Sequence, residues 1–436
     1  MNSDKAGTLE PKAVAELARQ FGTPLYAYDE LTIRAKCRAV LAMPNAFGLH
    51  VGYAMKANSS RAILQIVASE GLGIDASSIN EALRALRAGI PASRIMLTTQ
   101  DVPVGEARQQ LESLIAAGMM YNVCSFRQLE LIADCAKVHH RPVAMRVSPG
   151  VGSGESATRN TGDKYSSFGI HLANLEQVTA YARQRGVTIG TVHSHIGSGG
   201  DPEKWRENID RILDLTERYF PLATAVNLGG GFKEARMPDE SAADIQDLGR
   251  TAKQRFEQLA ARTGRKLTMV VEPGTYIVAN AGHIIASVLD KKSSGPDGFD
   301  FLVLDAGMET STRPLLYGSR HPFYVVSADG RLLSSEFDPS IASEQERVVV
   351  GRCCESGDSQ TLDDHGKIVP RRIADPVAGD YVVIGGAGAY CSSMTLVGYN
   401  SYGHAAEVLV RTDGSFLPIR QRQTLEQLTQ NELSLT

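Results

Sequence analysis

The 436-residue sequence has no excess of either charge, and this absence narrows the classes of protein to consider. Lys and Arg number 45 against 49 Asp and Glu, so the formal net charge is −4 at pH 7. Because the basic residues are dispersed and not clustered, the sequence lacks the electrostatic footprint of a nucleic-acid-binding protein. With 43% hydrophobic and 22% charged residues, the chain has an ordinary globular composition and is long enough for two domains.

Long apolar runs are also missing. The first residues, "MNSDKAGTLEPKAVAELARQFG", contain no apolar core of signal-peptide length. No stretch approaches the roughly 18 consecutive apolar residues of a membrane span. We therefore expect a cytoplasmic protein with no membrane partner.

Cysteine is scarce, and its spacing excludes two common uses. The six cysteines are Cys37, Cys124, Cys135, Cys353, Cys354 and Cys391. They have neither the density nor the spacing of a disulfide framework or a zinc site, so we expect no metal. Cys353 and Cys354 are adjacent, too close for ordinary disulfide geometry, and a chemical role is the better interpretation of that pair.

What the sequence does contain, from about residue 49 to 275, is an alternation of short apolar runs and amphipathic segments. This alternation is typical of repeated βα units with a parallel sheet. Eight strands are expected, the number that closes a TIM-type (β/α)8 barrel. Their sequences are "HVGYAM", "LGIDAS", "RIMLTTQ", "MYNVCS", "VAMRVS", "TIGTVHSH", "AVNLGG" and "TMVVEPG".

After about residue 280 the pattern changes to short β-rich runs divided by Gly, Asp and Pro, which predicts a C-terminal antiparallel β-domain. We expect the early run at residues 24–30, "PLYAYDE", to join that domain. The predicted organisation is an N-terminal segment (1–45), a barrel (46–279) and a β-domain (280–436). The stretch "KKSSGPDG" at 291–298 is predicted to be a flexible loop.

Polar and glycine residues gather where six of the eight expected barrel strands end. Each of them alone is more often a cap or a turn residue, but six strand ends agree, and barrel enzymes place their catalytic groups there. The residues are Lys56, Asp75, Arg146, His195, Gly229 to Gly231 and Glu272.

The residue types at these strand ends suit one cofactor, pyridoxal phosphate. Lys56 offers an amine for a covalent bond, and "LGGGF" at 228–232 offers backbone amides to a phosphate. Glu272 in "VEPG" offers a carboxylate that keeps a pyridine nitrogen protonated. The glycine run alone is a weak signal, because such runs also make plain tight turns.

Seven motifs, in order along the chain, carry a family resemblance. They are "YAMKAN", "HSHIGSG", "LGGGF", "EPGTYIVANAG", "RPLLYG", "CCESGD" and "GAGAYCSSM" followed by "YN". In this order they resemble the fold-type III pyridoxal-phosphate decarboxylases, and among these most closely the diaminopimelate decarboxylases. The resemblance extends over roughly residues 20 to 415. It implies decarboxylation of meso-2,6-diaminopimelate to L-lysine, the last step of lysine biosynthesis.

By this resemblance, Lys56 is the lysine that binds the cofactor covalently, and Glu272 is the partner of the pyridine nitrogen. His195 resembles the imidazole that lies against the cofactor ring. Asp75 and Arg146 resemble the residues around the lysine and the phenolic oxygen. The remaining expected cofactor contacts, mostly to the phosphate, are Ser198, Gly230, Gly231, Gly274, Thr275 and Tyr399.

In the second domain, the resemblance implies four substrate contacts and a proton donor. Cys354 resembles the residue that protonates the substrate carbon after carbon dioxide leaves, although a small buried hydrophobe is the alternative. Because the cysteine segment in this family reaches the partner subunit's site, the resemblance implies a homodimer with shared active sites. The expected substrate contacts are Arg313, Tyr317, Glu355 and Tyr399.

The sequence departs from the common family pattern at two places. Many members read Glu-Pro-Gly-Arg where this chain has Thr275, and many read Tyr-Asn-Ser-Arg-Pro where it has Tyr399-Asn-Ser-Tyr-Gly403. A decarboxylase of another carboxylated amine or basic amino acid, such as a siderophore or polyamine precursor, therefore stays open. A catalytically silent regulatory protein is disfavoured because Lys56 and Cys354 are both present. A racemase is disfavoured because Glu272 stands where it would have an arginine.

Overall fold

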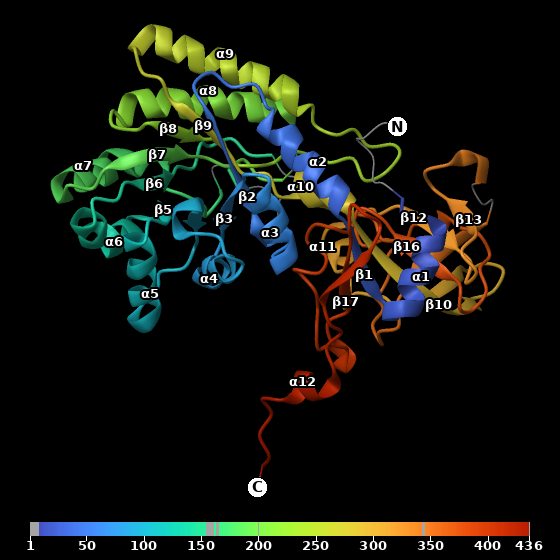
Figure 1. Ribbon diagram of the computed structural model, residues 1–436. Coiled ribbons are helices and arrows are strands. Elements are labelled where there is room, and N and C mark those ends of the chain that lie inside the picture. Colours follow the sequence, from blue (N-terminus) through green and yellow to red (C-terminus); the bar gives the residue numbers. More distant parts are fainter. Residues whose placement is uncertain (1–7, 154–160, 163–164, 199, 342–344, 436) are drawn as a thin grey trace. The chain divides into compact units, whose positions relative to one another are not determined.

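The computed structural model describes residues 8–153, 161–162, 165–198, 200–341 and 345–435 (Figure 1). The chain divides into two compact units. The first, here called the barrel unit, comprises Arg34–Lys233 and Ala243–Ile277. The second, the sheet unit, comprises Met1–Ile33, Glu234–Ala242 and Val278–Thr436. The functional ranges expected from the sequence, 1–45, 46–279 and 280–436, stay predictions.

The barrel unit contains a closed barrel of eight strands in the order β2 to β9. All eight neighbouring pairs are parallel, and β2 closes the ring against β9. The expected TIM-type barrel is thus confirmed, with each predicted run forming one strand. The strands are β2 (Leu49–Ala54), β3 (Gly73–Ala76), β4 (Ile95–Thr98), β5 (Met120–Val123), β6 (Val143–Arg146), β7 (Ile189–His193), β8 (Ala225–Asn227) and β9 (Thr268–Val271).

Helices follow the barrel strands, and short polar side chains begin several of them. Ser78 and Ser125 each accept a hydrogen bond from the backbone N–H three residues later, which satisfies an otherwise unpaired helix donor. Gly186 and Gly264 end two helices in the left-handed conformation. The helices are α2 (Glu30–Leu41), α3 (Arg61–Ser69), α4 (Ile79–Arg87), α5 (Gly105–Ala116), α6 (Phe126–Val138), α7 (Leu175–Arg185), α8 (Pro202–Tyr219), α9 (Ile245–Thr263) and α10 (Thr275–Val278).

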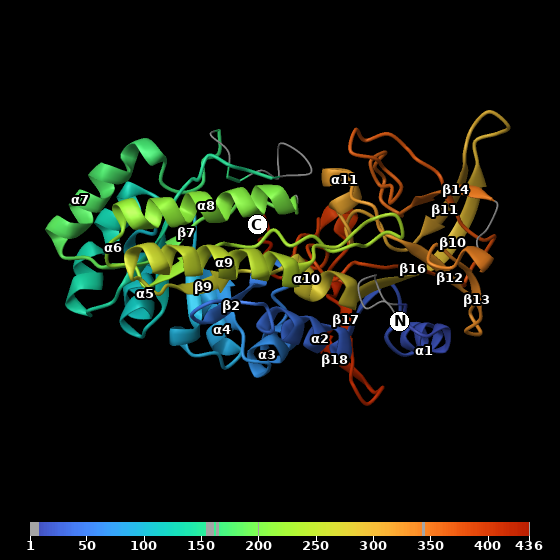
Figure 2. The same cartoon turned by 90° about the horizontal axis from the view of Figure 1, so that it is seen from above.

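Helices α8 and α9 lie side by side in both views (Figures 1 and 2). Ion pairs link them across the surface, Arg206 to Asp247 and Arg255 to Asp210. These pairs are partly exposed to solvent, so each stabilises the helix pair by at most about 1 kcal/mol. Buried apolar side chains such as Ile209 and Phe256 supply the larger share of the packing.

The sheet unit is built on a ten-stranded sheet. Strand β1 pairs in parallel with β17 and antiparallel with β10, so the early run joins this sheet. The β11–β14 pair is also parallel, and the remaining pairs of this sheet are antiparallel. Strands β10, β11 and β14 can be followed in order in Figure 2. The strands are β1 (Leu25–Asp29), β10 (Gly282–Ser293), β11 (Asp300–Leu304), β12 (Phe323–Val326), β13 (Leu332–Ser335), β14 (Glu346–Val350), β15 (Arg371–Arg372), β16 (Tyr381–Ile384), β17 (Ala406–Val410) and β18 (Phe416–Arg420).

Helix α1 (Pro11–Phe21) covers part of this sheet. Its Val14 and Leu17 are completely buried against a cluster that includes Leu25 and Val408. Burying such side chains stabilises the unit by roughly 1.5–3 kcal/mol each. Two short helices complete the unit, α11 (Arg313–Tyr317) and α12 (Leu425–Thr429).

The prediction of a flexible loop at 291–298 is wrong for its first three residues. Lys291, Lys292 and Ser293 belong to β10 and pair with β11. Only the turn after Ser293 leaves the ladder, and Gly295 takes a φ of 101° there. The apolar partners Phe301 and Leu302 on β11 lie far enough along the sequence that their pairing was not evident from the polar run itself.

In the part of the chain that the structure describes, no helix combines the length and the apolar composition needed to cross a membrane.

Candidate active site

The carboxyl ends of the barrel strands place several of the predicted residues on one end of the barrel. Lys56 lies in a 3-10 turn, Met55–Ala57, directly after β2. Asp75 lies in β3, Arg146 ends β6, and Glu272 follows β9. Asp75, Arg146 and Glu272 are buried, whereas Lys56 is exposed. The Lys56 ammonium is therefore accessible to solvent, whereas the charged groups of Asp75, Arg146 and Glu272 at the same end of the barrel are buried.

Glu272 is held as a buried carboxylate by two side chains. Asn227 donates a hydrogen bond to Oε1 at 2.6 Å, and Nε2 of His193 lies 3.3 Å from Oε2. Burial raises the pKa of Glu272, but the His193 imidazole and the Asn227 amide outweigh burial and lower the pKa to about 2. The carboxylate is consequently ionised at any pH at which the protein would work.

Behind His193, a polar chain crosses the barrel interior. Its Nδ1 lies 2.6 Å from Nδ2 of Asn122, which also donates to Thr98 Oγ1 at 3.0 Å. The Asn122 amide therefore holds one side of the imidazole, and its other nitrogen, Nε2, faces Glu272. Asn122 thus positions the imidazole that faces the carboxylate.

His195 is oriented by the glycine run. The N–H of Gly230 donates to Nδ1 of His195 at 3.1 Å. Burial and the nearby Arg146 and Lys56 cations lower the pKa of His195 well below its usual value. The ring is therefore neutral, with its remaining proton on Nε2. The Gly230 N–H is thus paired within the protein, and its predicted contact with a phosphate stays a prediction.

Close backbone packing explains why three glycines follow β8. A Cβ on Gly229 would lie 2.7 Å from Nδ1 of His195, and one on Gly230 would lie 2.4 Å from the Glu272 carbonyl oxygen. Gly229 and Gly231 also have φ of +67° and +93°, a region that disfavours side chains. The run lets the strand ends that carry His195 and Glu272 approach each other.

In the sheet unit, Arg313 begins α11 and is buried. Its guanidinium donates to Ser319 Oγ at 3.1 Å and lies about 6 Å from the ring centres of Tyr317 and Tyr390. The Tyr317 hydroxyl points at Met394 Sδ, 3.8 Å away. Arg313 and Tyr317 are therefore neighbours, as their spacing in one short helix requires.

Cys354, Glu355 and Tyr399 also come together in the sheet unit. The Tyr399 hydroxyl donates to Oε2 of Glu355 at 3.3 Å, and all three residues are exposed. Hydrogen bonds from the Gly357 N–H and the Ser356 hydroxyl, with a smaller one from Tyr399, lower the pKa of Glu355. This carboxylate is thus an exposed anion beside an exposed thiol.

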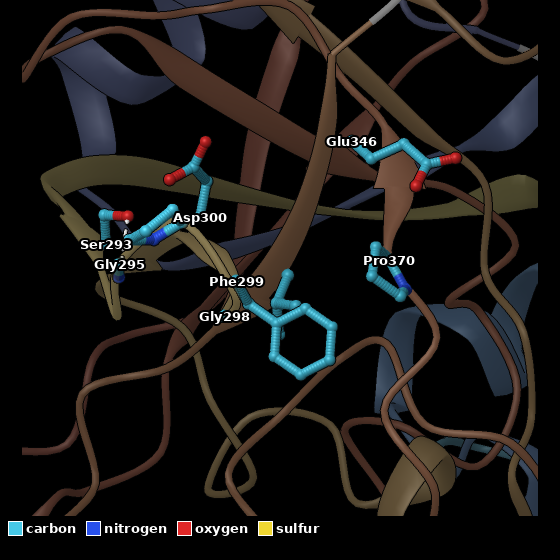
Figure 3. Close-up of a pocket in the computed structure, with 9 residues that line it drawn as sticks. Ser293, Gly295, Gly298, Phe299, Asp300, Glu346 and Pro370 are labelled. Atoms are coloured by element: carbon cyan, nitrogen blue, oxygen red, sulfur yellow. Dashed lines mark hydrogen bonds between the residues drawn. The ribbon is translucent and has the colours of Figure 1, made fainter.

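A separate hollow of about 560 Å³ lies at the edge of the sheet (Figure 3). Phe299 of the β10–β11 turn and Asp300 at the start of β11 line it from one side, and Glu346 and Pro370 line it from the opposite side. None of the predicted site residues lines this hollow, so it has no part in the argument for an active site.

Comparison with known proteins shows which family this chain belongs to. Residues 32–279 match the family model described as "Pyridoxal-dependent decarboxylase, pyridoxal binding domain", more than half of the chain. The chain belongs to the pyridoxal-dependent decarboxylase family. Pyridoxal phosphate is accordingly its cofactor, as the residue types at the strand ends predicted.

Full-length relatives in this decarboxylase family are diaminopimelate decarboxylases. The chain is 32% identical to that of Streptomyces coelicolor over 430 residues, which covers 98% of this chain and 93% of the relative. The one from Methanothermobacter thermautotrophicus is 33% identical over 426 residues, with coverage of 96% and 93%.

Solved structures of diaminopimelate decarboxylases share the fold of this chain over most of their length. The diaminopimelate decarboxylase of M. jannaschii, solved with L-lysine, has a TM-score of 0.82 at 26% identity and covers 96% of this chain and 94% of its own. The enzyme of Helicobacter pylori, also complexed with L-lysine, has a TM-score of 0.78 at 27% identity, with coverage of 95% and 98%.

The barrel residues fit the cofactor of this decarboxylase family. Oδ1 of Asp75 and Nη2 of Arg146 are buried yet have no hydrogen-bond partner among the described residues. Leaving such atoms unpaired costs free energy, so they indicate a polar group that binds against them. Burial and the Glu272 carboxylate raise the pKa of Asp75, and the Lys56 ammonium acts in the opposite direction. Lys56, Arg146 and Glu272 offer an amine, a cation and an anion to the cofactor.

The other predicted cofactor residues have less distinctive surroundings. Ser198 is exposed, and Thr275 begins α10 and is partly buried. A Cβ on Gly274 would lie 3.2 Å from the Cβ atoms of Ala54 and Ala57. The Gly-, Ser- and Thr-rich segment 152–167, whose composition and place after a barrel strand favour a lid over the site, lies largely outside the described residues.

Three buried residues that contact Glu272 or support its surroundings were not predicted from the sequence: Asn122, His193 and Asn227. Asn122 and Asn227 are completely buried amides within the apolar runs "MYNVCS" and "AVNLGG". A polar residue in an otherwise apolar strand was the available signal. His193 lies in the motif "HSHIGSG", two residues before the predicted His195.

Proposed function

We propose that this chain decarboxylates meso-2,6-diaminopimelate to L-lysine and carbon dioxide. The observation that carries the proposal is the Glu272 carboxylate, buried and ionised between His193 and Asn227, in a chain whose full-length relatives are diaminopimelate decarboxylases. When bound, pyridoxal phosphate supplies a protonated ring that accepts the electron pair left by carbon dioxide.

Each barrel residue has a distinct task in this proposal. Lys56 is the amine that holds the cofactor covalently and is exchanged for the substrate amine. Glu272 keeps a proton on the ring nitrogen, and its low pKa ensures that it does so as an anion. The His195 imidazole is neutral and is oriented by the Gly230 N–H. Its flat face can therefore lie against the cofactor ring without adding a positive charge beside the protonated ring nitrogen.

Eight further residues complete the proposed cofactor site: Asp75, Arg146, Ser198, Gly230, Gly231, Gly274, Thr275 and Tyr399.

The sheet unit supplies the proposed substrate groups. Diaminopimelate has a second amino-acid head, which needs a cation for its carboxylate and an anion for its ammonium. Arg313 and Glu355 offer that pair, with Tyr317 and Tyr399 beside them. The Cys354 thiol is the proposed donor of the proton that replaces carbon dioxide on the substrate carbon. The site is proposed to be shared between the subunits of a cytoplasmic homodimer.

One observation favours a second candidate, decarboxylation of a different carboxylated amine. Thr275 stands where many relatives have an arginine, so one cation expected near the substrate or phosphate is absent. Arg320, an arginine of the sheet unit that could offer a replacement cation, is exposed and pairs with Asp239 at 2.9 Å. A substrate with a smaller negative charge at its distal end would suit such a site.

The test is carbon dioxide release by the purified protein with pyridoxal phosphate. Rates with meso-diaminopimelate, L-ornithine, L-lysine and L-arginine are compared under identical conditions. We expect a strong preference for diaminopimelate. Arg313→Met should reduce this preference by raising the KM for diaminopimelate. Arg331→Met, at an exposed arginine of the same unit, should leave the preference unchanged. Release from none of the four, with cofactor bound, would favour the second candidate.

A further inference from the structure

Two short segments of the sheet unit lie against each other in antiparallel order. Residues 399–402, "YNSY", here called the clamp segment, contact residues 352–355, "RCCE", at three successive points. Tyr399 binds the Glu355 carboxylate, Asn400 binds the Cys354 backbone, and the Tyr402 ring faces the Arg352 guanidinium. The contacts span 44 to 50 residues of sequence, so they are tertiary and not part of a local turn.

Asn400 makes the central contact in an unusual backbone conformation. Its φ is 48° and ψ is 27°, the left-handed region that asparagine tolerates better than most residues. In this conformation its Oδ1 accepts the N–H of Cys354 at 2.8 Å. The hydrogen bond holds the main chain of the proposed proton donor and leaves its thiol exposed.

Tyr402 makes the outer contact, at the position where this chain departs from the usual Tyr-Asn-Ser-Arg-Pro. The Arg352 guanidinium lies 3.8 Å from the centre of the Tyr402 ring, within the range of a favourable cation–π contact. Nε of Arg352 also lies 3.3 Å from Oε1 of the buried Glu309. The aromatic ring at 402 thus has a specific partner in this chain.

The opposite side of the cysteine turn is anchored by Asp358, which is buried. Its carboxylate accepts the N–H of Cys353 at 2.7 Å and the N–H of Met308 at 2.6 Å. The Cys353 thiol lies 3.4 Å from Oε2 of Glu309. Cys353 is therefore held on the inner side of the turn, while Cys354 and Glu355 face outward.

We propose that Asn400 and Tyr402 are positioning residues, which hold the Cys354–Glu355 turn so that its thiol and carboxylate keep one fixed placement. The part of this inference that concerns catalysis rests on the proposed role of Cys354 as proton donor. The clamp itself is a property of the fold and is testable without turnover.

The experiment compares four variants of the full-length enzyme loaded with cofactor. Asn400→Gly keeps a residue that favours positive φ and removes only the acceptor. Ser401→Gly is the matched control, because Ser401 is exposed and also left-handed, with φ of 61°. Tyr402→Phe keeps the ring over Arg352, and Tyr402→Leu removes it.

The first readout is hydrogen exchange of the Cys354 amide, measured by mass spectrometry with residue-level fragmentation. Loss of one hydrogen bond should speed exchange about 5- to 10-fold in Asn400→Gly. Ser401→Gly and Tyr402→Phe should match the parent protein. Unchanged exchange in Asn400→Gly would overturn the clamp, whatever the activity.

The second readout separates kcat from KM. Asn400→Gly and Tyr402→Leu should lower kcat on the order of 10-fold, since small misplacements of a catalytic group are costly, with cofactor affinity unchanged. Faster exchange without a change in kcat, in a protein in which Cys354→Ala does lower kcat, would overturn the positioning role. If Cys354→Ala has no effect on kcat, the proton-donor part of the proposed function fails and the exchange result alone decides the clamp.

Discussion

The Nε2 atom of His193 lies 3.3 Å from Oε2 of Glu272, and both side chains are buried in the barrel. A carboxylate in such a place would ordinarily take up a proton, because burial disfavours charge. Here the imidazole and the Asn227 amide reverse that tendency, and the pKa of Glu272 is lowered to about 2. The barrel thus keeps Glu272 anionic despite its burial.

Replacing Glu272 by Gln should remove this anion while keeping the shape of the side chain. We expect kcat to fall on the order of 10²- to 10³-fold, because the charge that stabilises the protonated ring is lost. Cofactor affinity should change much less, since Lys56 and the phosphate contacts remain. Steady-state rates together with cofactor titration measure both quantities. An undiminished kcat would mean that another group protonates the ring nitrogen.

Asn227→Leu is the companion variant for Glu272. It leaves the carboxylate in place but deletes its 2.6 Å hydrogen bond. Because the amide helps to lower the pKa of Glu272, its loss should raise that pKa, so kcat of the variant should fall at acid pH values where Glu272 of the parent protein is still ionised. A profile identical to that of the parent protein would argue against control of Glu272 by Asn227.

Lys56→Ala tests the covalent attachment. The variant should lose the visible absorbance of bound cofactor and at least about 10³-fold in turnover, because no other amine takes its place at the end of β2. Lys253→Ala is the matched control, since Lys253 is an exposed lysine paired with Glu257 on α9. Substantial activity in Lys56→Ala, under conditions that exclude free amines, would remove Lys56 from the mechanism.

The barrel was predictable because its pattern is local. Each buried strand is a short apolar run, and each following helix repeats apolar residues every three or four positions, so eight runs in order indicate eight strands. The strand-end positions of Lys56, Asp75, Arg146 and Glu272 followed from the same pattern. Parallel strands bring those ends to one side of the barrel, and no further information was needed.

The contacts that tune the site were not predictable in this way. His193 meets Glu272 and Asn122 only because β5, β7 and β9 curve into one barrel, and sequence spacing does not report which inward side chains touch. The contact of Asn400 with Cys354 spans 46 residues and depends on a left-handed backbone, which asparagine allows without requiring. The pairing of β11 with β14 in parallel likewise depends on the course of the long connection between them.

Cys354→Ala should slow the reaction without loosening the cofactor. If the thiol donates the proton to the substrate carbon, kcat should fall about 10²-fold or more, as is typical of a lost general acid. Cys353→Ala is the matched control, because Cys353 is adjacent but held inward by Glu309 and Asp358. Stopped-flow rates and cofactor titration of both variants decide the matter. Equal effects of the two substitutions would point to the turn as a whole and not to the Cys354 thiol.

His283 should make folding stability depend on pH. It lies in β10, is 2% exposed, and packs edge-on against Tyr324. Burial lowers its pKa from 6.5 to about 4, with a small opposing effect from Asp29. Between pH 6.5 and 4, the unfolded chain therefore binds a proton on His283 that the folded chain does not bind. The contribution of neutral His283 to the free energy of unfolding is fully present above pH 6.5 and declines as pH falls through this window.

The size of the effect follows from the shift: a difference of about 2.5 pKa units corresponds to roughly 3 kcal/mol between pH 7 and pH 4. His283→Gln removes the titrating group, and its own cost in stability should be the same at both pH values. Urea unfolding of the parent protein and the variant at pH 7.5, 6.5, 5.5 and 4.5 gives the difference between them. That difference should shrink steadily as the pH falls, because the parent protein alone loses the contribution of a neutral His283. A constant difference across the series would show that His283 takes up its proton equally well in the folded chain.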